Sequence, residues 1–212
     1  MRIGRLHVIT DGTLQTRFGH VELARLALEG GAETVQYRRK DGTARQMIAE
    51  AAEIHALCRR HRARLIVNDR VDIAMAVDAD GVHLGVDDLP IGFARELLGA
   101  TRLIGGSSDN AEEAVSLARQ SVDYAGIGPV FATRSKQDTG PVLGLEGLAA
   151  AVRATTLPLI AIGGISIENI DQVLATGVHG VAVLGAVCLA DDPLLATRTL
   201  RERIDRRGTA TP

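Results

Sequence analysis

Two short apolar runs of this chain are each followed by a carboxylate. Asp69 comes directly after the run that ends at Asn68, and Asp88 follows the next run, residues 81–85. If the runs are neighbouring parallel strands, their carboxyl ends lie at one edge of a sheet and the carboxylates converge there. Such a pair suits Mg²⁺, which keeps several waters and bridges to substrate phosphates. Either residue alone could instead cap the helix that follows it.

A cationic cluster closes an earlier apolar stretch. Its residues are Gln36-Tyr37-Arg38-Arg39-Lys40. In an extended chain Gln36, Arg38 and Lys40 share one side, while Tyr37 and Arg39 point the other way. The planar fork of an Arg and the point charge of a Lys together suit a diphosphate group. The alternative interpretation is a solvated loop with ordinary surface cations.

Further candidate phosphate contacts follow later apolar runs. Ser107 ends one run, and its hydroxyl either donates a hydrogen bond to a phosphate or has no role beyond the entry to a helix. Lys136 lies in the long segment 128–144, which has the length of a functional lid. Gly163-Gly164 and Leu184-Gly185 end the last two runs, the usual phosphate position of a parallel barrel. The histidines have no zinc spacing, and His83, inside a run, is predicted to be structural.

Regular alternation of β-branched runs with helical patterns predicts a single (β/α)8 TIM barrel over residues 1–207, with 208–212 as a disordered tail. Gly30-Gly31 and Gly177 are predicted helix C-caps, and Ser166 a helix N-cap. A doubly wound sheet is the rival fold, but no Gly-x-Gly-x-x-Gly follows the first strand. The predicted strands are Leu6–Thr10, Thr34–Tyr37, Leu65–Asn68, Gly81–Leu84, Leu103–Ser107, Tyr124–Ile127, Pro158–Ile162 and Gly180–Leu184.

Composition excludes several classes of partner. An aromatic content of 2% argues against base stacking on nucleic acid, and a net charge of −2 gives no general attraction to polyanions. The most apolar segment, 181–190, is about half the ~20 residues that a membrane span needs. Cys58 and Cys188 are predicted core thiols, so a cytoplasmic protein is expected. The sequence leaves a homo-oligomer open.

Several segments, in this order, resemble the thiamine-phosphate synthase family from about Leu6 to Cys188. They are the cluster 36–40, Val67-Asn68-Asp69, residues 80–85 with Asp88, Gly105-Gly106-Ser107, residues 128–136 and Ile162-Gly163-Gly164-Ile165. The resemblance implies a Mg²⁺-dependent transferase. It would join hydroxymethylpyrimidine diphosphate to a thiazole phosphate through a pyrimidine carbocation, releasing thiamine phosphate and diphosphate.

The resemblance also implies roles for single residues. The pyrimidine diphosphate is expected at Gln36, Arg38, Lys40, Asn68, Ser107 and Lys136, within a binding segment that also contains Tyr37 and Arg39. Arg38, Lys40 and Lys136 are expected to stabilise the leaving group, and Asp69 and Asp88 to hold Mg²⁺. The thiazole phosphate is expected at Thr133, Arg134, Ser135, Gly164, Leu184 and Gly185.

The chain departs from the family pattern at a few positions, and two rival functions stay open. Ser135 replaces a usual Thr, Gly185 a frequent Ser, and Asp109 a frequent His, while Arg39 adds a charge. A related thiazole tautomerase is the first rival, but it calls for a His where this chain has Pro129. A phosphate-binding barrel without catalytic activity is the second.

Overall fold

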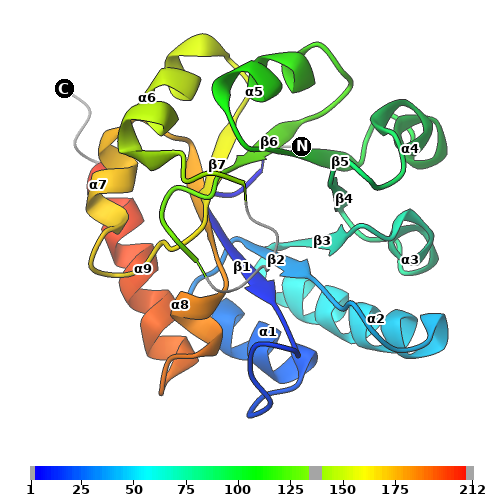
Figure 1. Ribbon diagram of the computed structural model, residues 1–212. Coiled ribbons are helices and arrows are strands. Elements are labelled where there is room, and N and C mark those ends of the chain that lie inside the picture. The colour runs from blue at the N-terminus through cyan, green and yellow to red at the C-terminus, as the bar shows by residue number, and fades with distance from the viewer. Residues whose placement is uncertain (1–2, 134–139, 209–212) are drawn as a thin grey trace.

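The strands of this protein close into a barrel. The computed structural model describes residues 3–133 and 140–208. In these residues the strands pair in parallel and in chain order from β1 to β8, and β8 pairs back onto β1. Helices surround the barrel (Figure 1). The predicted (β/α)8 architecture is therefore confirmed, and the doubly wound open sheet is excluded.

The strands are β1 (Leu6–Thr10), β2 (Thr34–Tyr37), β3 (Arg64–Asn68), β4 (Gly81–Leu84), β5 (Leu103–Ser108), β6 (Tyr124–Ile127), β7 (Leu159–Ile162) and β8 (Gly180–Val183). The helices are α1 (His20–Glu29), α2 (Ala44–His61), α3 (Val71–Ala76), α4 (Ile91–Leu98), α5 (Ala111–Ala118), α6 (Gly144–Ala154), α7 (Ile170–Ala175), α8 (Gly185–Cys188) and α9 (Pro193–Gly208). Residues 209–212 of the expected tail lie outside the described part.

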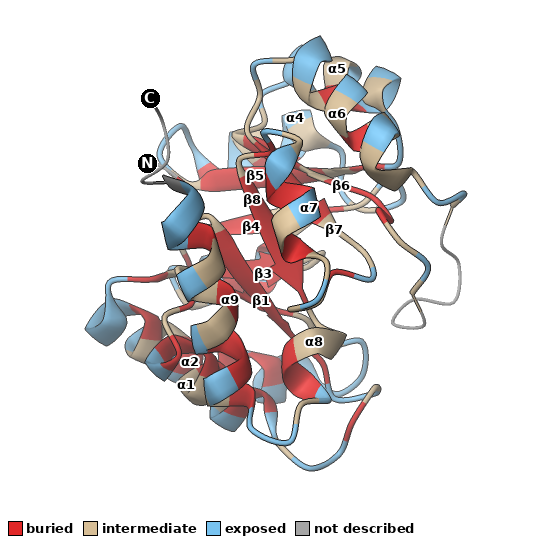
Figure 2. Cartoon of the chain, turned by 90° about the vertical axis from the view of Figure 1, so that its left-hand side faces the viewer, coloured by how far each residue is buried: buried red, intermediate tan, exposed pale blue. Residues whose placement is uncertain are grey.

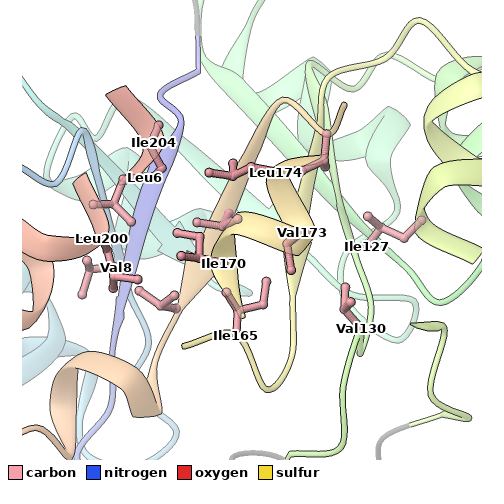
Figure 3. Packing of buried hydrophobic residues seen from close by; sticks show 14 of the residues in the cluster. Leu6, Val8, Ile127, Val130, Ile165, Ile170, Val173, Leu174, Leu200 and Ile204 are labelled. Atoms are coloured by element: carbon pink, nitrogen blue, oxygen red, sulfur yellow. The ribbon is translucent and has the colours of Figure 1, made fainter. Parts of the chain in front are cut away.

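The core has an outer layer between strands and helices. On β1, Leu6 and Val8 face Leu200 of α9, which is buried with them in one apolar cluster that also includes residues of α7 (Figure 3). Burying each such aliphatic side chain contributes about 1.5–3 kcal/mol. Figure 2 shows the result, with buried strands in the middle and exposed residues on the outer faces of the helices. Near-continuous apolar runs form these strands because both of their faces are covered.

Three carboxylates fasten the amino-terminal end of the barrel. Glu33, Asp80 and Asp123 each precede an even-numbered strand and accept a backbone N–H at the start of the strand before it, at 2.8–3.2 Å. The arginines paired with them are Arg201, Arg64 and Arg95 respectively. This end therefore contributes stability, while the opposite end is left for a site.

Most of the predicted helix ends are confirmed. Gly30 caps α1, with Gly31 next to it at φ 97°, and Gly177 follows α7 at φ 85°. The prediction for Ser166 was wrong, because α7 starts only at Ile170. A turn comes first, in which Asn169 Oδ1 accepts the Ser166 N–H at 2.9 Å and the Ser166 carbonyl accepts the Ile170 N–H at 3.0 Å.

Candidate active site

A cavity of about 630 Å³ opens at the carboxyl ends of the strands. Its wall contains eleven of the residues predicted from the sequence, namely Gln36, Arg38, Lys40, Asn68, Asp69, Asp88, Ser107, Thr133, Gly164, Leu184 and Gly185. They come from loops and strand ends that are far apart in the chain. Arg134, Ser135 and Lys136 lie outside the described residues, so their predicted roles stay predictions.

The end of β2 divides its residues between the cavity and the helix layer. Gln36, Arg38 and Lys40 line the cavity, as the alternation predicts. Tyr37 and Arg39 point toward α2 instead, where the Tyr37 hydroxyl and the Arg39 guanidinium donate to the two oxygens of Glu50 at 2.7 and 2.6 Å. The structure therefore does not bring Tyr37 and Arg39 together with the other candidate residues.

A buried carboxylate that the sequence interpretation missed holds Arg38. Asp11 follows β1, and the register pairs Thr10 with Tyr37, so Asp11 and Arg38 are neighbours and form an ion pair. Burial by itself would raise the pKa of Asp11. Hydrogen bonds from Thr13 and Leu14, together with the charge of Arg38, outweigh burial and hold this pKa below its usual value. Asp11 thus stays ionised and orients the guanidinium.

The two predicted metal ligands lie in the same part of the cavity. The carboxylate of Asp69 accepts Lys40 Nζ at 2.5 Å, and Asp88 accepts the Gly85 N–H at 2.7 Å. Burial raises the pKa of Asp88, and the neighbouring Asp69 raises it further. Asp69 also has φ 63°, a left-handed conformation that costs energy in a residue other than glycine.

Neither carboxylate acts as a helix cap through its side chain. Helix α3 has Arg70 at its N-cap and α4 has Pro90, and neither N-cap makes a side-chain capping bond. Helix capping therefore does not account for the two carboxylates.

The donor set fits Mg²⁺ and not a metal that needs many protein ligands. Residues 3–133 and 140–208 contain no group of three or more His, Cys, Asp or Glu placed to hold an ion. Mg²⁺ is commonly held by one or two carboxylates, with waters and substrate oxygens completing the shell. A cation between Asp69 and Asp88 would also relieve the repulsion that raises the Asp88 pKa.

His83 lines the cavity, which the sequence interpretation missed. Its Nε2 lies 3.1 Å from Ser107 Oγ, and its Nδ1 lies 3.2 Å from the hydroxyl of Tyr124. His83 was predicted to be structural because it lies inside an apolar strand. Strand alternation was the available signal, since β4 turns its alternate residues into the barrel.

The glycines after β7 allow loops to approach each other closely. Gly163 and Gly164 have φ 98° and 64°, which favour glycine. A Cβ at Gly164 would lie 2.7 Å from the carbonyl oxygen of Ala132, in the loop after β6. That loop is fixed where it begins, because Val130 and Phe131 donate to carbonyls of residues 162 and 163 at 2.9 and 3.0 Å.

Comparison with known proteins agrees with this geometry. The family model described as "Thiamine monophosphate synthase" matches residues 6–187. The chain is 48% identical to the thiamine-phosphate synthase of Salinibacter ruber over 96% of this chain and 89% of that protein. It is also 48% identical to the Chloroflexus aurantiacus enzyme, over 93% of this chain and 91% of the relative. The chain belongs to the thiamine monophosphate synthase family.

Solved structures extend this likeness to three dimensions. A thiamine phosphate pyrophosphorylase from Pyrococcus furiosus superposes with a TM-score of 0.88 and 42% identity, over 96% of both chains. A Bacteroides thetaiotaomicron structure has a TM-score of 0.68 at 18% identity, which shows the shared fold alone. The resemblance to the thiamine-phosphate synthase family is thus confirmed.

No helix in the described ranges is long and apolar enough to cross a membrane.

Proposed function

We propose that this protein joins a pyrimidine diphosphate to a thiazole phosphate with the help of Mg²⁺, giving thiamine phosphate and diphosphate. Its family makes it a transferase. The observation that carries the proposal is the meeting of the β2 cations with Asp69 and Asp88 in one cavity. Cations suit the diphosphate group and carboxylates its metal ion. A cytoplasmic location agrees with the two buried free cysteines.

Each part of the cavity has a task in this reaction. The diphosphate is held by Lys40 and by Arg38, which Asp11 orients. The Ser107 hydroxyl donates a hydrogen bond to it. Asp69 and Asp88 would hold Mg²⁺, which when bound would supply positive charge to compensate the departing diphosphate. The apolar floor of the cavity surrounds the uncharged ring; its residues include Ile9, Ile160 and Ala182. Breaking the C–O bond leaves a pyrimidine carbocation, and the thiazole nitrogen attacks it, so no protein nucleophile is required.

Two rival functions make different predictions. A thiazole tautomerase needs a proton-transfer group near the ring, and Pro129 in the cavity wall cannot transfer a proton. A barrel that only binds phosphate would release no diphosphate. Chromatography of one enzyme sample with both substrates, followed across a Mg²⁺ titration, separates the three. We expect Mg²⁺-dependent thiamine phosphate and little isomerised thiazole. Isomerisation without diphosphate release would reverse this assignment.

Substitution of the carboxylates tests the metal site. Asp69→Asn and Asp88→Asn should each lower turnover about 100-fold, because the ion loses a charged ligand. Asp72→Asn is the matched control, since Asp72 is an exposed carboxylate of α3 paired with Arg70 outside the cavity. Steady-state kinetics at several Mg²⁺ concentrations give the answer. Full activity in both Asp69→Asn and Asp88→Asn would remove the metal from this position.

A further inference from the structure

A chain of hydrogen bonds along the cavity wall connects a partly exposed residue to a buried one inside the barrel. It runs from Ser107 through His83 to Tyr124, with 3.1 Å between Ser107 Oγ and His83 Nε2 and 3.2 Å between His83 Nδ1 and the Tyr124 hydroxyl. Tyr124 is only 1% exposed, whereas Ser107 is partly exposed. The chain therefore begins at a buried hydroxyl and ends at a hydroxyl that a ligand can reach.

The barrel is built to bring these rings together. The strand registers place His83, Gly105 and Tyr124 in one row across β4, β5 and β6. A Cβ at Gly105 would lie 2.2 Å from Cζ of Tyr124 and 2.6 Å from Nδ1 of His83. A Cβ at Gly126 would lie 3.0 Å from Cε1 of His83. The two rings can meet across β5 only because these positions lack side chains.

The hydrogen bonds of this relay have a direction, which follows from which atoms carry a proton. In the part of the chain that the structure describes, the Tyr124 hydroxyl has one hydrogen-bond partner, Nδ1 of His83. Burial raises the pKa of Tyr124, so its hydroxyl keeps its proton and must place it on an acceptor. Nδ1 therefore accepts, and the proton of the neutral imidazole is on Nε2. Nε2 then donates to Ser107 Oγ, so the serine hydrogen is left for another acceptor.

We propose that Tyr124 and His83 are positioning residues that keep the Ser107 hydroxyl free to donate a hydrogen bond to an anionic oxygen of the ligand. The opposite direction would leave the Tyr124 hydrogen without an acceptor among the described residues. A hydroxyl whose hydrogen is available in this way suits a phosphate oxygen, which accepts hydrogen bonds. The identification of that oxygen as part of a diphosphate rests on the proposed function; the direction of the relay does not.

A double-mutant cycle on diphosphate binding tests the relay. The variants are Tyr124→Phe, which keeps the ring, Ser107→Ala, and the two combined. Calorimetric titration with inorganic diphosphate and Mg²⁺ gives the Kd of each, and kcat and KM are measured in parallel. Tyr124→Phe should raise Kd about tenfold in the wild-type background, as for loss of a hydrogen bond to a charged group. In the Ser107→Ala background it should change Kd less than about twofold.

Tyr37→Phe is the matched control. It removes a buried hydroxyl on β2 that faces Glu50 instead of the cavity, so Kd should stay within about twofold of wild type. Thermal unfolding and circular dichroism show whether each variant is folded. Equal losses from Tyr124→Phe in both backgrounds would mean that Tyr124 acts through the fold and not through Ser107. Unchanged Kd in the single variant would also overturn the relay.

The same measurements keep the two proposals apart. A wild-type protein that binds diphosphate with this coupling but forms no thiamine phosphate would contradict the proposed function and leave the relay in place. Product formation without coupling would do the reverse. No measurable diphosphate binding by the wild-type protein would contradict both.

Discussion

Arg38 depends on a neighbour for its direction. Asp11 is buried, keeps its charge and pairs with the guanidinium, while Thr13 and Leu14 fix the carboxylate. A long side chain at the rim of a cavity otherwise samples many rotamers, and ordering it costs up to ~2 kcal/mol. Because Asp11 already orders Arg38, an anion that binds there loses less of its binding free energy to the ordering of this side chain.

Asp11→Asn should raise the KM for the pyrimidine diphosphate about tenfold and change kcat less, because the amide keeps the loop bonds but loses the ion pair. The control is Asp41→Asn, since Asp41 is an exposed carboxylate paired with Arg39. Initial rates at varied pyrimidine diphosphate measure both variants. If KM is unchanged and the protein is still folded, Asp11 does not orient Arg38.

Local alternation explains which site residues could be predicted. Strand geometry alone assigns Gln36, Arg38 and Lys40 to one side, and the cavity contains all three. Alternation also turns His83 into the barrel, but the contacts of His83 and the role of Asp11 depend on which strands become neighbours. The ion pair of Asp11 needs the register between β1 and β2, and the contacts of His83 need the row across β4, β5 and β6.

At the scale of elements, hydrophobic runs predict the strands well. Predicted and observed strands differ by at most one residue at either end. Buried apolar runs are unambiguous where both faces are covered. Ser166 shows the limit, because serine also forms turns, and its turn with Asn169 delays the start of α7.

Two glycines on neighbouring elements should respond to alanine in opposite ways. A Cβ at Gly81, the first residue of β4, would lie 2.1 Å from the carbonyl oxygen of Leu103, so Gly81→Ala should lower the free energy of unfolding by about 3 kcal/mol. Gly92 lies within α4 with nothing within 4 Å of such a Cβ. Gly92→Ala should therefore raise stability by about 0.5–1 kcal/mol. Urea unfolding measures both changes in unfolding free energy. Equal changes would show that the backbone of β4 and β5 shifts at little cost to make room for the Cβ at position 81.

At the scale of the whole molecule, a buried histidine couples folding to pH. His7 lies inside the barrel with Nε2 3.1 Å from the Gly4 carbonyl, and burial lowers its pKa from 6.5 to about 3. The unfolded chain thus binds a proton between these values while the folded chain does not. The stability from His7 is complete above pH 6.5 and is lost as pH falls toward 3, by at most about 1.4 kcal/mol per pH unit.

Glutamine at position 7 cannot be protonated. Between pH 7 and pH 5 the free energy of unfolding of His7→Gln should therefore fall by about 1–2 kcal/mol less than that of the wild type. The exposed His61 provides the control, and His61→Gln should follow the wild-type curve. Urea unfolding at a series of pH values gives the comparison. Parallel curves for wild type and His7→Gln would show that His7 does not carry this dependence.

The wall of the cavity is shared between the two halves of the chain. Arg38, Lys40 and Asp69 come from the first half, and Ser107, Gly164 and Gly185 from the second. A molecule that contacts both groups binds only when the barrel is closed, so mass action makes it a stabiliser of the fold. At 100 times its Kd such a ligand adds about 2.7 kcal/mol. For a domain of this size that corresponds to a rise in melting temperature of roughly 5–10 °C. Ligands of this barrel can therefore be recognised by heat resistance alone, before any turnover is measured.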